Sequence, residues 1–356
     1  MNSANQLKLN AIEILKQLIK TPSISREESA VASLIAERLS LAGVKPSRYL
    51  NNVWAQNQHF DPAKPTLILN SHLDTISPNA GYTRNPFQAS VEDGRLYGLG
   101  SNDAGASVVA LMAAFLYFES RTDLNHNLIY AATAEEEISG PGGIEALLPM
   151  LPKISAGLVG EPTGMQMAVA EKGLLVLDCV AVGKSGHAAR DEGENAIYKA
   201  IRDIEWFKEF KFDKVSLLLG PNKMTVTIIE AGSQHNVVPQ ACKFTVDVRL
   251  NEFYDFESVL KVIREKVGSD VKPRSMRIKS TSIELEHPLV KAGSALGLSY
   301  YGSPTTSDKA LMPFPALKIG PGESRRSHTA DEYVEISEIE AGIDLYIKIL
   351  EKVILQ

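Results

Sequence analysis

The sequence predicts an α/β protein of two domains, in which a smaller α+β domain is inserted into the first. Helical and strand-like patterns alternate over about the first 170 residues, as they do in proteins with a largely parallel sheet. Over residues 171–282 the order becomes strand, helix, strand, strand, helix, strand, which is typical of a ferredoxin-like unit. Residues 283–356 return to shorter helices, a strand and a long final helix. We therefore assign residues 1–170 and 283–356 to one discontinuous domain and residues 171–282 to the insert.

Length and composition limit the classes of protein to consider. At 356 residues the chain exceeds the size at which a single hydrophobic core usually keeps growing. A net charge of −6 argues against a nucleic acid or an anionic membrane as the partner. No apolar run approaches the roughly 18 residues of a membrane span, and the first 20 residues lack the features of a secretory signal. We therefore expect a cytoplasmic protein in which Cys179 and Cys242 are small buried hydrophobic residues rather than a disulfide.

The first domain is expected to begin with two helices. Ser25 and Glu28 carry the signature of a capping box that opens one of them, and Gly43 can close it. A further helix is expected over residues 107–118. The first of the two is an amphipathic surface helix, predicted by apolar residues at helical spacing: Leu7, Ile12, Leu15, Leu18 and Ile19.

Short apolar strands are predicted over residues 65–70, 127–133 and 157–162. Potential ligands follow each of them. In open α/β sheets, ligands bind beyond the carboxyl ends of the strands. The side chains expected at that edge are His72, Glu135, Glu136 and Glu161.

The insert is expected to open with a strand from about residue 170. Its helices and remaining strands follow in the order given above, over residues 194–210, 224–230, 241–250, 255–267 and 271–283. After the insert, a strand at 316–319 and a final helix after Glu335 return the chain to the first domain. His328 lies in this last part, so the C-terminal segment must fold back if His328 is to join the other ligands.

Five segments combine metal-type ligands or paired carboxylates with small residues. Together they supply two imidazoles and several carboxylates but no cysteine, which is the ligand chemistry of a catalytic rather than a structural zinc site. The candidates are His72 and Asp74, Asp103, Glu135 and Glu136, Glu161, and His328.

Each segment also has an ordinary structural interpretation. His72 could be a turn histidine with Asp74 as a helix cap, although one intervening residue places both on the same side of an extended backbone. In that arrangement Asp74 could hold the second ring nitrogen of a ligating His72. Asp103 could belong to a glycine-rich turn, Glu161 to a turn before proline, and His328 could cap the following segment.

Three consecutive glutamates, Glu135 to Glu137, are usually a solvated run. Here they follow the buried-type strand NLIYAAT, which makes three free surface carboxylates less natural. Neighbouring carboxylates can divide the work, one binding a metal and the next accepting a proton from its water.

The insert carries two candidate groups for a small ligand. His187 follows a glycine and precedes alanines, so its imidazole can project, although a plain loop histidine is the alternative. Arg249 lies on the polar face of the strand that contains residues 241–250. A planar guanidinium there could hold a carboxylate by paired hydrogen bonds, whereas pairing with Asp247 is the structural alternative.

These residues resemble the di-zinc deacylase family that includes acetylornithine deacetylase and succinyl-diaminopimelate desuccinylase, with related aminoacylases and carboxypeptidases. The matching motifs run from TPSIS through SHLDT, TAEEE, GEPT, SGH and NVVP to SHTADEY. The resemblance implies a zinc-peptidase-like catalytic domain, an insert that serves as lid and dimerisation domain, and a homodimer. It also implies a cis peptide bond between Asp103 and Ala104. One departure is Ala104-Gly105, where the family commonly has Met-Lys-Gly, and this favours a divergent subgroup.

The resemblance implies two zinc ions per chain, with cobalt or manganese able to substitute. Asp103 would bridge the two ions. One ion would also bind His72 and Glu161, and the other would bind Glu136 and His328.

Further roles follow from the same resemblance. Glu135 would be the general base, and Asp74 would lie behind the ligands. His187, Asn236 and Arg249 match positions that contact the substrate. His187 would act catalytically across the dimer, where it would stabilise the tetrahedral oxyanion together with the zinc ions. Apart from the resemblance, Ser307 and Asp308 in PTTSDKA are further candidates for the pocket.

The expected activity is hydrolysis of the amide bond of a small N-acyl amino acid. An acetylornithine deacetylase-like enzyme of arginine biosynthesis, acting on N-acetyl or N-succinyl ornithine or citrulline, is the leading interpretation. The alternatives are a succinyl-diaminopimelate desuccinylase and a dipeptidase or aminopeptidase of the same family. A binding protein that has lost catalysis would lack a ligand or a base, and none is missing here.

Overall fold

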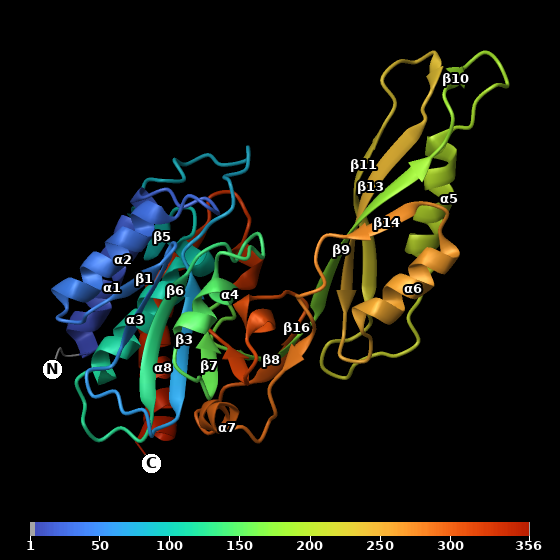
Figure 1. Cartoon of the computed structure of the whole chain (residues 1–356). Coiled ribbons are helices and arrows are strands. Elements are labelled where there is room, and N and C mark those ends of the chain that lie inside the picture. Colours follow the sequence, from blue (N-terminus) through green and yellow to red (C-terminus); the bar gives the residue numbers. More distant parts are fainter. Residues whose placement is uncertain (1–3, 356) are drawn as a thin grey trace. The chain divides into compact units, whose positions relative to one another are not determined.

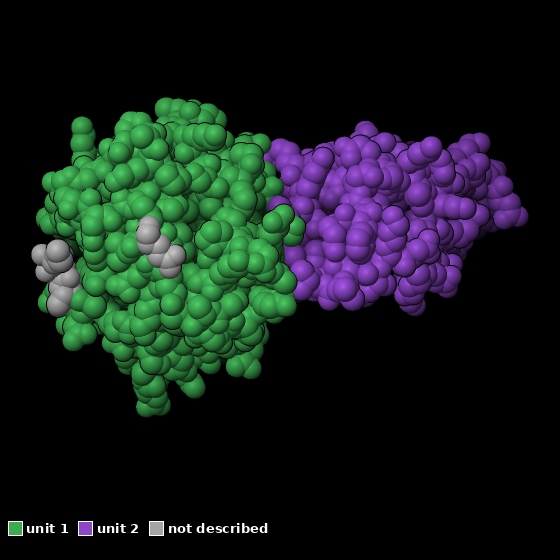
Figure 2. All heavy atoms as spheres, turned by 90° about the horizontal axis from the view of Figure 1, so that it is seen from below, with its two compact units in different colours: residues 1–169, 282–301, 307–356 green, residues 170–281, 302–306 purple. Residues whose placement is uncertain are grey.

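The computed structural model describes residues 4–355 and contains two compact units, coloured separately in Figure 2. Unit 1 comprises the chain up to Val169, Ser282–Tyr301 and the chain from Ser307. Unit 2 comprises Ala170–Thr281 and Gly302–Thr306. The fold is thus the predicted α/β fold with an inserted α+β domain.

A nine-stranded mixed sheet forms the centre of unit 1 (Figure 1). At its middle, β6 (Asn127–Thr133), β3 (Thr66–His72) and β7 (Ala156–Val159) lie parallel and adjacent. The strand order is β1-β2-β6-β3-β7-β17-β8-β15, with β16 paired to β8. The outer strands are β1 (Ser47–Tyr49), β2 (Asn52–Gln56), β17 (Ala316–Lys318), β8 (Met167–Glu171), β15 (Thr281–Ser282) and β16 (Tyr300–Ser303).

Both faces of this sheet are buried, which explains why its middle strands read as continuous apolar runs. Leu67 and Leu69 of β3 face one core, whereas Ile68 between them faces another. The larger core contains residues of α1 (Ala4–Lys20), α2 (Ser29–Leu41), α3 (Ala106–Phe118), α7 (Pro288–Ser294) and α8 (Ile336–Ile354). The smaller core contains residues of α4 (Ile144–Leu147).

Helix α3 is the central helix of the larger core. It contacts both α1 and α8, and its residues are apolar on all sides, as expected of a fully buried helix. The segment Ser101–Phe118 is long and apolar enough to span a membrane by composition, but 83% of it is buried inside the protein. That burial is what a core helix of a globular unit shows.

The predicted capping box at Ser25–Glu28 is wrong. Helix α2 begins at Ser29, and Glu28 makes no side-chain cap at its start. The hydroxyl of Ser25 instead donates to Asp74 at 2.7 Å, and the carboxylate of Glu28 accepts from the backbone N–H of Arg26. Both side chains serve the loops around the candidate site rather than the helix.

Unit 2 has the predicted ferredoxin-like order, with an antiparallel sheet arranged β11-β13-β9-β14. Its core contains residues of both helices and of the sheet. The expected strand over residues 271–283 is shorter: it pairs over Asp270–Pro273, and only Thr281 and Ser282 form a further strand. The elements are β9 (Gly173–Val182), α5 (Ala196–Glu209), β11 (Lys223–Ala231), β13 (Ala241–Leu250), α6 (Phe256–Lys266) and β14 (Asp270–Pro273).

Two smaller features complete the fold. In unit 2, β10 (Gly186–His187) pairs with β12 (Val237–Val238). In unit 1, β4 (Ser90–Glu92), β5 (Arg95–Tyr97) and β18 (Tyr333–Glu335) form a small antiparallel sheet. Both cysteines are buried and free, as expected.

Candidate active site

The candidate ligands meet at the carboxyl edge of the central sheet, where the sequence predicts them. His72 is the last residue of β3 and lies opposite Thr133, the last residue of β6. The three glutamates follow β6, and Glu161 follows β7. Asp103 comes from the irregular turn Ser101–Gly105 before α3, and His328 comes from the segment before β18. The C-terminal segment therefore folds back onto the first part of unit 1.

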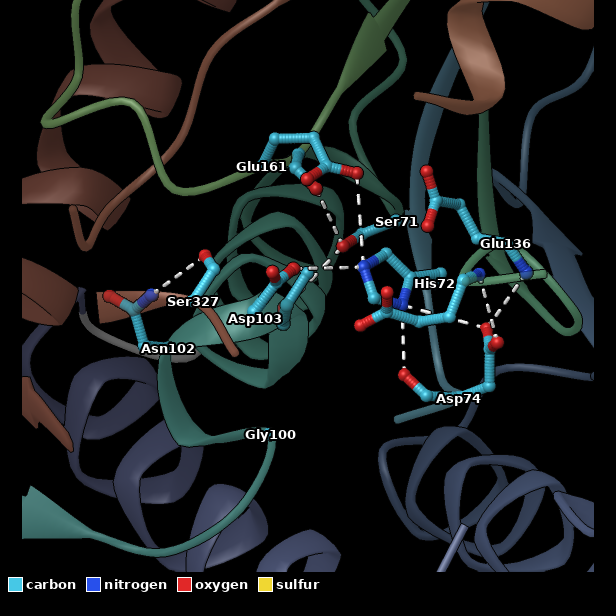
Figure 3. Close-up of polar contacts among 12 residues, drawn as sticks. Ser71, His72, Asp74, Gly100, Asn102, Asp103, Glu136, Glu161 and Ser327 are labelled. Carbon is cyan, nitrogen blue, oxygen red and sulfur yellow. Dashed lines mark hydrogen bonds and ion pairs between the residues drawn. The ribbon is translucent and has the colours of Figure 1, made fainter. Parts of the chain in front are cut away.

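Asp103 lies between two imidazoles (Figure 3 shows it beside His72). Its Oδ1 is 3.2 Å from His72 Nε2, and its Oδ2 is 3.8 Å from His328 Nε2. His72 Nε2 is also 3.8 Å from Glu161 Oε1. The peptide bond between Asp103 and Ala104 is cis, as the resemblance implies. One carboxylate oxygen thus faces each histidine, which is the arrangement of a group shared between two cations.

The side chain of Glu135 lies within the loop that follows β6. Its carboxylate accepts from the backbone N–H of Gly142 at 3.1 Å. Its backbone N–H donates to Glu28, and its φ of 57° lies in the left-handed region. A Cβ at Gly140 would lie 2.0 Å from its Oε2, so the glycine-rich loop closes tightly around this side chain. Glu135 holds the loop together and makes none of the contacts of the histidine–carboxylate cluster.

The next two glutamates face the cluster instead. Glu137 Oε2 is 2.9 Å from His328 Nε2. Ligand-type atoms of His72, Asp103 and Glu137 all lie within 4.8 Å of one another, and so do those of His72, Glu136 and Glu161. Glu137 thus lies next to His328, whereas Glu136 lies near His72 and Glu161. The left-handed backbone at Glu135 directs the side chain of that residue into its own loop.

Asp74 contacts the site through both its backbone carbonyl and its carboxylate. His72 Nδ1 is 2.9 Å from the backbone carbonyl oxygen of Asp74 but 3.6 Å from its carboxylate. A ring N–H donated to this carbonyl leaves the Nε2 lone pair facing Asp103. The carboxylate of Asp74 accepts from the backbone N–H group of Glu136 at 2.9 Å (Figure 3) and from that of Glu137 at 3.1 Å. Asp74 thus fixes the segment that presents both glutamates.

The cluster contains more carboxylates than imidazoles, so negative charge is crowded at this site. Burial, together with the charges of Glu161 and Glu137, raises the pKa of Glu136 well above its ordinary value. Burial also raises the pKa of Glu137, against the effect of its hydrogen bond to His328. The same hydrogen bond raises the pKa of His328 to about 9. The 2.9 Å contact with Glu137 favours the protonated imidazole, so the raised pKa of His328 governs the pair.

His72 and Asp103 form the second strong pair. Burial disfavours the charged imidazole, but the nearby carboxylates of Asp103 and Asp74 leave the pKa of His72 well above its ordinary value. Burial likewise opposes ionisation of Asp103, yet contact with His72 lowers its pKa. Each histidine of the cluster thus lies against a carboxylate that favours positive charge at its position.

The donor set fits metal ions. In a tetrahedral zinc shell with bonds of about 2.0–2.2 Å, neighbouring ligand atoms lie roughly 3.4 Å apart. The contacts of 3.2 and 3.8 Å that His72 makes, and those of 2.9 and 3.8 Å that His328 makes, bracket that spacing. Imidazole nitrogens and carboxylate oxygens are zinc ligands, and bound cations would neutralise the crowded carboxylates.

Asp308 and Ser307 lie beside this cluster but are buried. Their relative exposures are 4% and 5%. Asp308 accepts from the hydroxyl of Thr133 at 2.7 Å, and burial raises its pKa to about 6. Its charge also acts on Glu136. A direct substrate contact by either residue stays a prediction.

In unit 2 the structure brings His187 and Asn236 together. The backbone N–H of Ala188 donates to the carbonyl oxygen of Asn236 at 2.9 Å, and His187 Nδ1 accepts from the backbone N–H of Ala189 at 3.1 Å. Arg249 on β13 makes the alternative contact considered for it: Nε and Nη2 donate to the two carboxylate oxygens of Asp247 at 2.8 and 2.9 Å. The substrate contacts of all three residues stay predictions.

Comparison with known proteins identifies the family. The model described as peptidase family M20/M25/M40 matches residues 68–352. The chain belongs to that family. The match includes every residue of the metal-type cluster, the whole of unit 2 and unit 1 from residue 68 to residue 352. M20 members are metal-dependent, and this chain is a hydrolase of amide bonds.

The curated relatives indicate which members of the M20 family this chain resembles in sequence. The chain is 26% identical, over 96% of its own length and 98% of the relative, to the succinyl-diaminopimelate desuccinylase of Cereibacter sphaeroides. It is 30% identical, over 74% and 73% of the two chains, to the enzyme of that name from Wigglesworthia glossinidia brevipalpis. These relatives support the desuccinylase alternative better than the acetylornithine deacetylase-like activity, and nothing among them supports arginine biosynthesis.

Solved structures share the fold at lower identity. An M20 family metallo-carboxypeptidase from Sulfolobus solfataricus superposes with a TM-score of 0.79 at 18% identity, covering 99% of both chains. A dinuclear metal-binding M20 peptidase from Bacillus subtilis superposes with a TM-score of 0.69 at 14% identity, covering 97% of this chain and 98% of the other. At this identity the likeness concerns the fold alone.

Proposed function

We propose that this chain is a two-zinc deacylase that removes the succinyl group from an N-succinyl amino acid of the diaminopimelate type. The observation that carries the proposal is the Asp103 carboxylate, which faces His72 with one oxygen and His328 with the other. Full-length similarity to desuccinylases supports the choice of substrate. Neutral dipeptides are the competing substrates, because solved structures of the same fold include peptidases.

We assign the ligands as follows. His72 and Glu161 would hold one ion and Glu137 and His328 the other, with Asp103 shared between them. His72 Nε2 lies 3.2 Å from Asp103 and 3.8 Å from Glu161, and His328 Nε2 lies 2.9 Å from Glu137 and 3.8 Å from Asp103, distances that one ion in each group can span. Two bound metal ions would polarise the scissile carbonyl and lower the pKa of the attacking water.

Glu136 is the general base in this proposal. It lies close to His72 and Glu161, whereas Glu137 is committed to His328 and Glu135 to the loop. Its raised pKa suits a group that must accept a proton and return it. Glu136 takes a proton from water as the water oxygen bonds to the amide carbon, and it delivers that proton to the leaving nitrogen as the C–N bond breaks.

Unit 2 is proposed to bind the substrate and to form a homodimer. Arg249 would hold a substrate carboxylate in exchange for Asp247, and His187 and Asn236 would contact the acyl group. Burial lowers the pKa of Lys172, and the positive charges of Arg249 and Lys223 lower it further. Positive charge is therefore concentrated around Arg249. The edge strand β11 pairs with β13 on one side, and Ile228 and Ile229 on it are about half exposed. An exposed apolar edge of this kind can pair with a second copy.

A substrate panel tests the proposed activity. Purified protein with added zinc should hydrolyse N-succinyl-diaminopimelate faster than N-acetylornithine, N-acetylcitrulline or neutral dipeptides. Release of a free amine from each substrate is measured at equal concentration. Preference for N-acetylornithine would restore the first interpretation of the sequence, and preference for dipeptides would overturn the deacylase assignment.

A further inference from the structure

Glu332 binds the loop that carries Asp103. It is 2% exposed, and it lies one residue before β18, where the antiparallel register with β5 places it opposite the start of that loop. Its Oε1 accepts from the backbone N–H groups of Asn102 and Asp103 at 2.8 and 2.9 Å. Its Oε2 accepts from the backbone N–H of Gly100 at 2.9 Å. One carboxylate thus receives three backbone donors from the four residues that end at Asp103.

The same segment also carries His328. Asp331 anchors it on its outer side, accepting from the backbone N–H groups of Thr83 and Arg84 at 3.0 and 2.9 Å. Asn102 ties the Asp103 loop to the segment a second time: its amide donates to the carbonyl oxygen of Glu323 at 3.1 Å and accepts from the N–H of Glu323 at 2.9 Å. Glu332 therefore connects the loop of one candidate ligand to the segment of another.

We infer that Glu332 is a positioning residue that sets the distance between Asp103 and His328, and hence the second metal site. The inference rests on the proposed two-metal function. His72 and Glu161 are held at the ends of β3 and β7, so the first site depends less on this contact. Partners that orient metal ligands without touching the ion typically change metal affinity by roughly 10–100-fold when replaced.

Glutamine is the informative replacement, because its amide has one acceptor oxygen. Whichever way the amide is turned, its NH₂ group must face a backbone N–H of the loop. The side-chain volume is kept, but at least one of the three hydrogen bonds becomes a contact between two donors. Glu332→Asp is the second variant: it keeps the charge and both oxygens but has a shorter reach.

The control lies three residues further on. Glu335 caps α8 and pairs with Arg95 at 2.9 Å, away from the Asp103 loop. Glu335→Ala should lower the melting temperature while leaving metal binding unchanged. It therefore separates a loss of stability from a loss of ligand geometry.

The measurement is calorimetric titration of chelator-treated protein with zinc, alongside thermal melts of the metal-free forms. Unaltered protein should bind two equivalents. Glu332→Gln should weaken one of the two by roughly 10–100-fold and leave the other less affected, and Glu332→Asp should give a smaller loss. Two sites of unchanged affinity in both variants, or an equal loss in Glu335→Ala, would overturn the role of Glu332. Failure of the unaltered protein to bind two equivalents would overturn the proposed function itself, and this role with it.

Discussion

Replacing Glu136 with glutamine removes the proposed general base while keeping the shape of the side chain. The neutral amide cannot accept a proton from water, but the backbone contact that positions the residue survives. Its N–H donates to Asp74 at 2.9 Å, and this bond does not involve the side chain. The variant should therefore fold and retain two metal ions.

The expected loss in turnover follows from the role. General base catalysis contributes roughly 10²–10⁴-fold, which corresponds to about 2.7–5.4 kcal/mol of transition-state stabilisation at 1.36 kcal/mol per tenfold. The raised pKa of Glu136 suits it to accept a proton, so its loss should be felt within this range. KM should change little, since the proposed substrate contacts lie on other residues.

The assay compares three variants under the same conditions. Glu136→Gln, Glu137→Gln and Glu135→Gln are each measured for turnover of N-succinyl-diaminopimelate and for bound zinc. Glu137→Gln should lose metal, since it removes a proposed ligand. Glu135→Gln should stay within roughly tenfold of the unaltered protein, because an amide oxygen can still accept from Gly142. Loss of zinc in Glu136→Gln would make Glu136 a ligand, and full activity in it would refute the assignment of the base.

Three further outcomes are expected. Asp74→Asn cannot accept from both N–H groups of Glu136 and Glu137, so zinc affinity should fall roughly 10–100-fold in a metal titration. Unchanged affinity would contradict the role of Asp74 in positioning the two glutamates. The pKa of His328 is raised to about 9 by Glu137, so this pair stabilises the metal-free protein fully below the ordinary histidine pKa of about 6.5 and loses that effect as pH rises through about 9. As pH rises from about 6.5 to about 9, the melting temperature of the metal-free unaltered protein should fall more than that of metal-free His328→Gln. Equal falls would count against a stabilising pair of His328 and Glu137. Arg249→Lys should raise KM for a carboxylate-bearing substrate roughly tenfold or more while zinc binding is unchanged, and an unaltered KM would remove Arg249 from the substrate site.

The predicted fold depended on patterns that sequence carries well. Continuous apolar runs marked β3, β6 and β7 because both faces of the sheet are covered, and the ends of these strands located His72 and Glu161. The insert was recognisable because its strands and helices have distinct periods. Strands and helices of this kind can be predicted because each depends on the spacing of apolar residues within one short segment.

The assignment among the glutamates could not be made in the same way. Three identical side chains follow β6, and their directions depend on the left-handed backbone at Glu135 and on the contact of its carboxylate with Gly142. The sequence indicates that Glu137 could also face the site only by the fact that it is the third glutamate of the run.

The contacts that hold the ligand loops were also invisible in sequence. Glu28, Asp74 and Glu332 use buried carboxylates to accept backbone N–H groups from loops distant along the chain. Such contacts follow from the tertiary fold, because any acidic residue near a helix or strand end has many possible partners.

The most direct test of the central claim is the zinc dependence of amide hydrolysis. Chelator-treated protein is titrated with zinc while turnover of N-succinyl-diaminopimelate is recorded. The account predicts that turnover is lost on chelation and is restored by zinc, reaching its plateau at two equivalents per chain. Turnover that survives chelation undiminished, and that zinc does not change, would contradict a two-metal hydrolase.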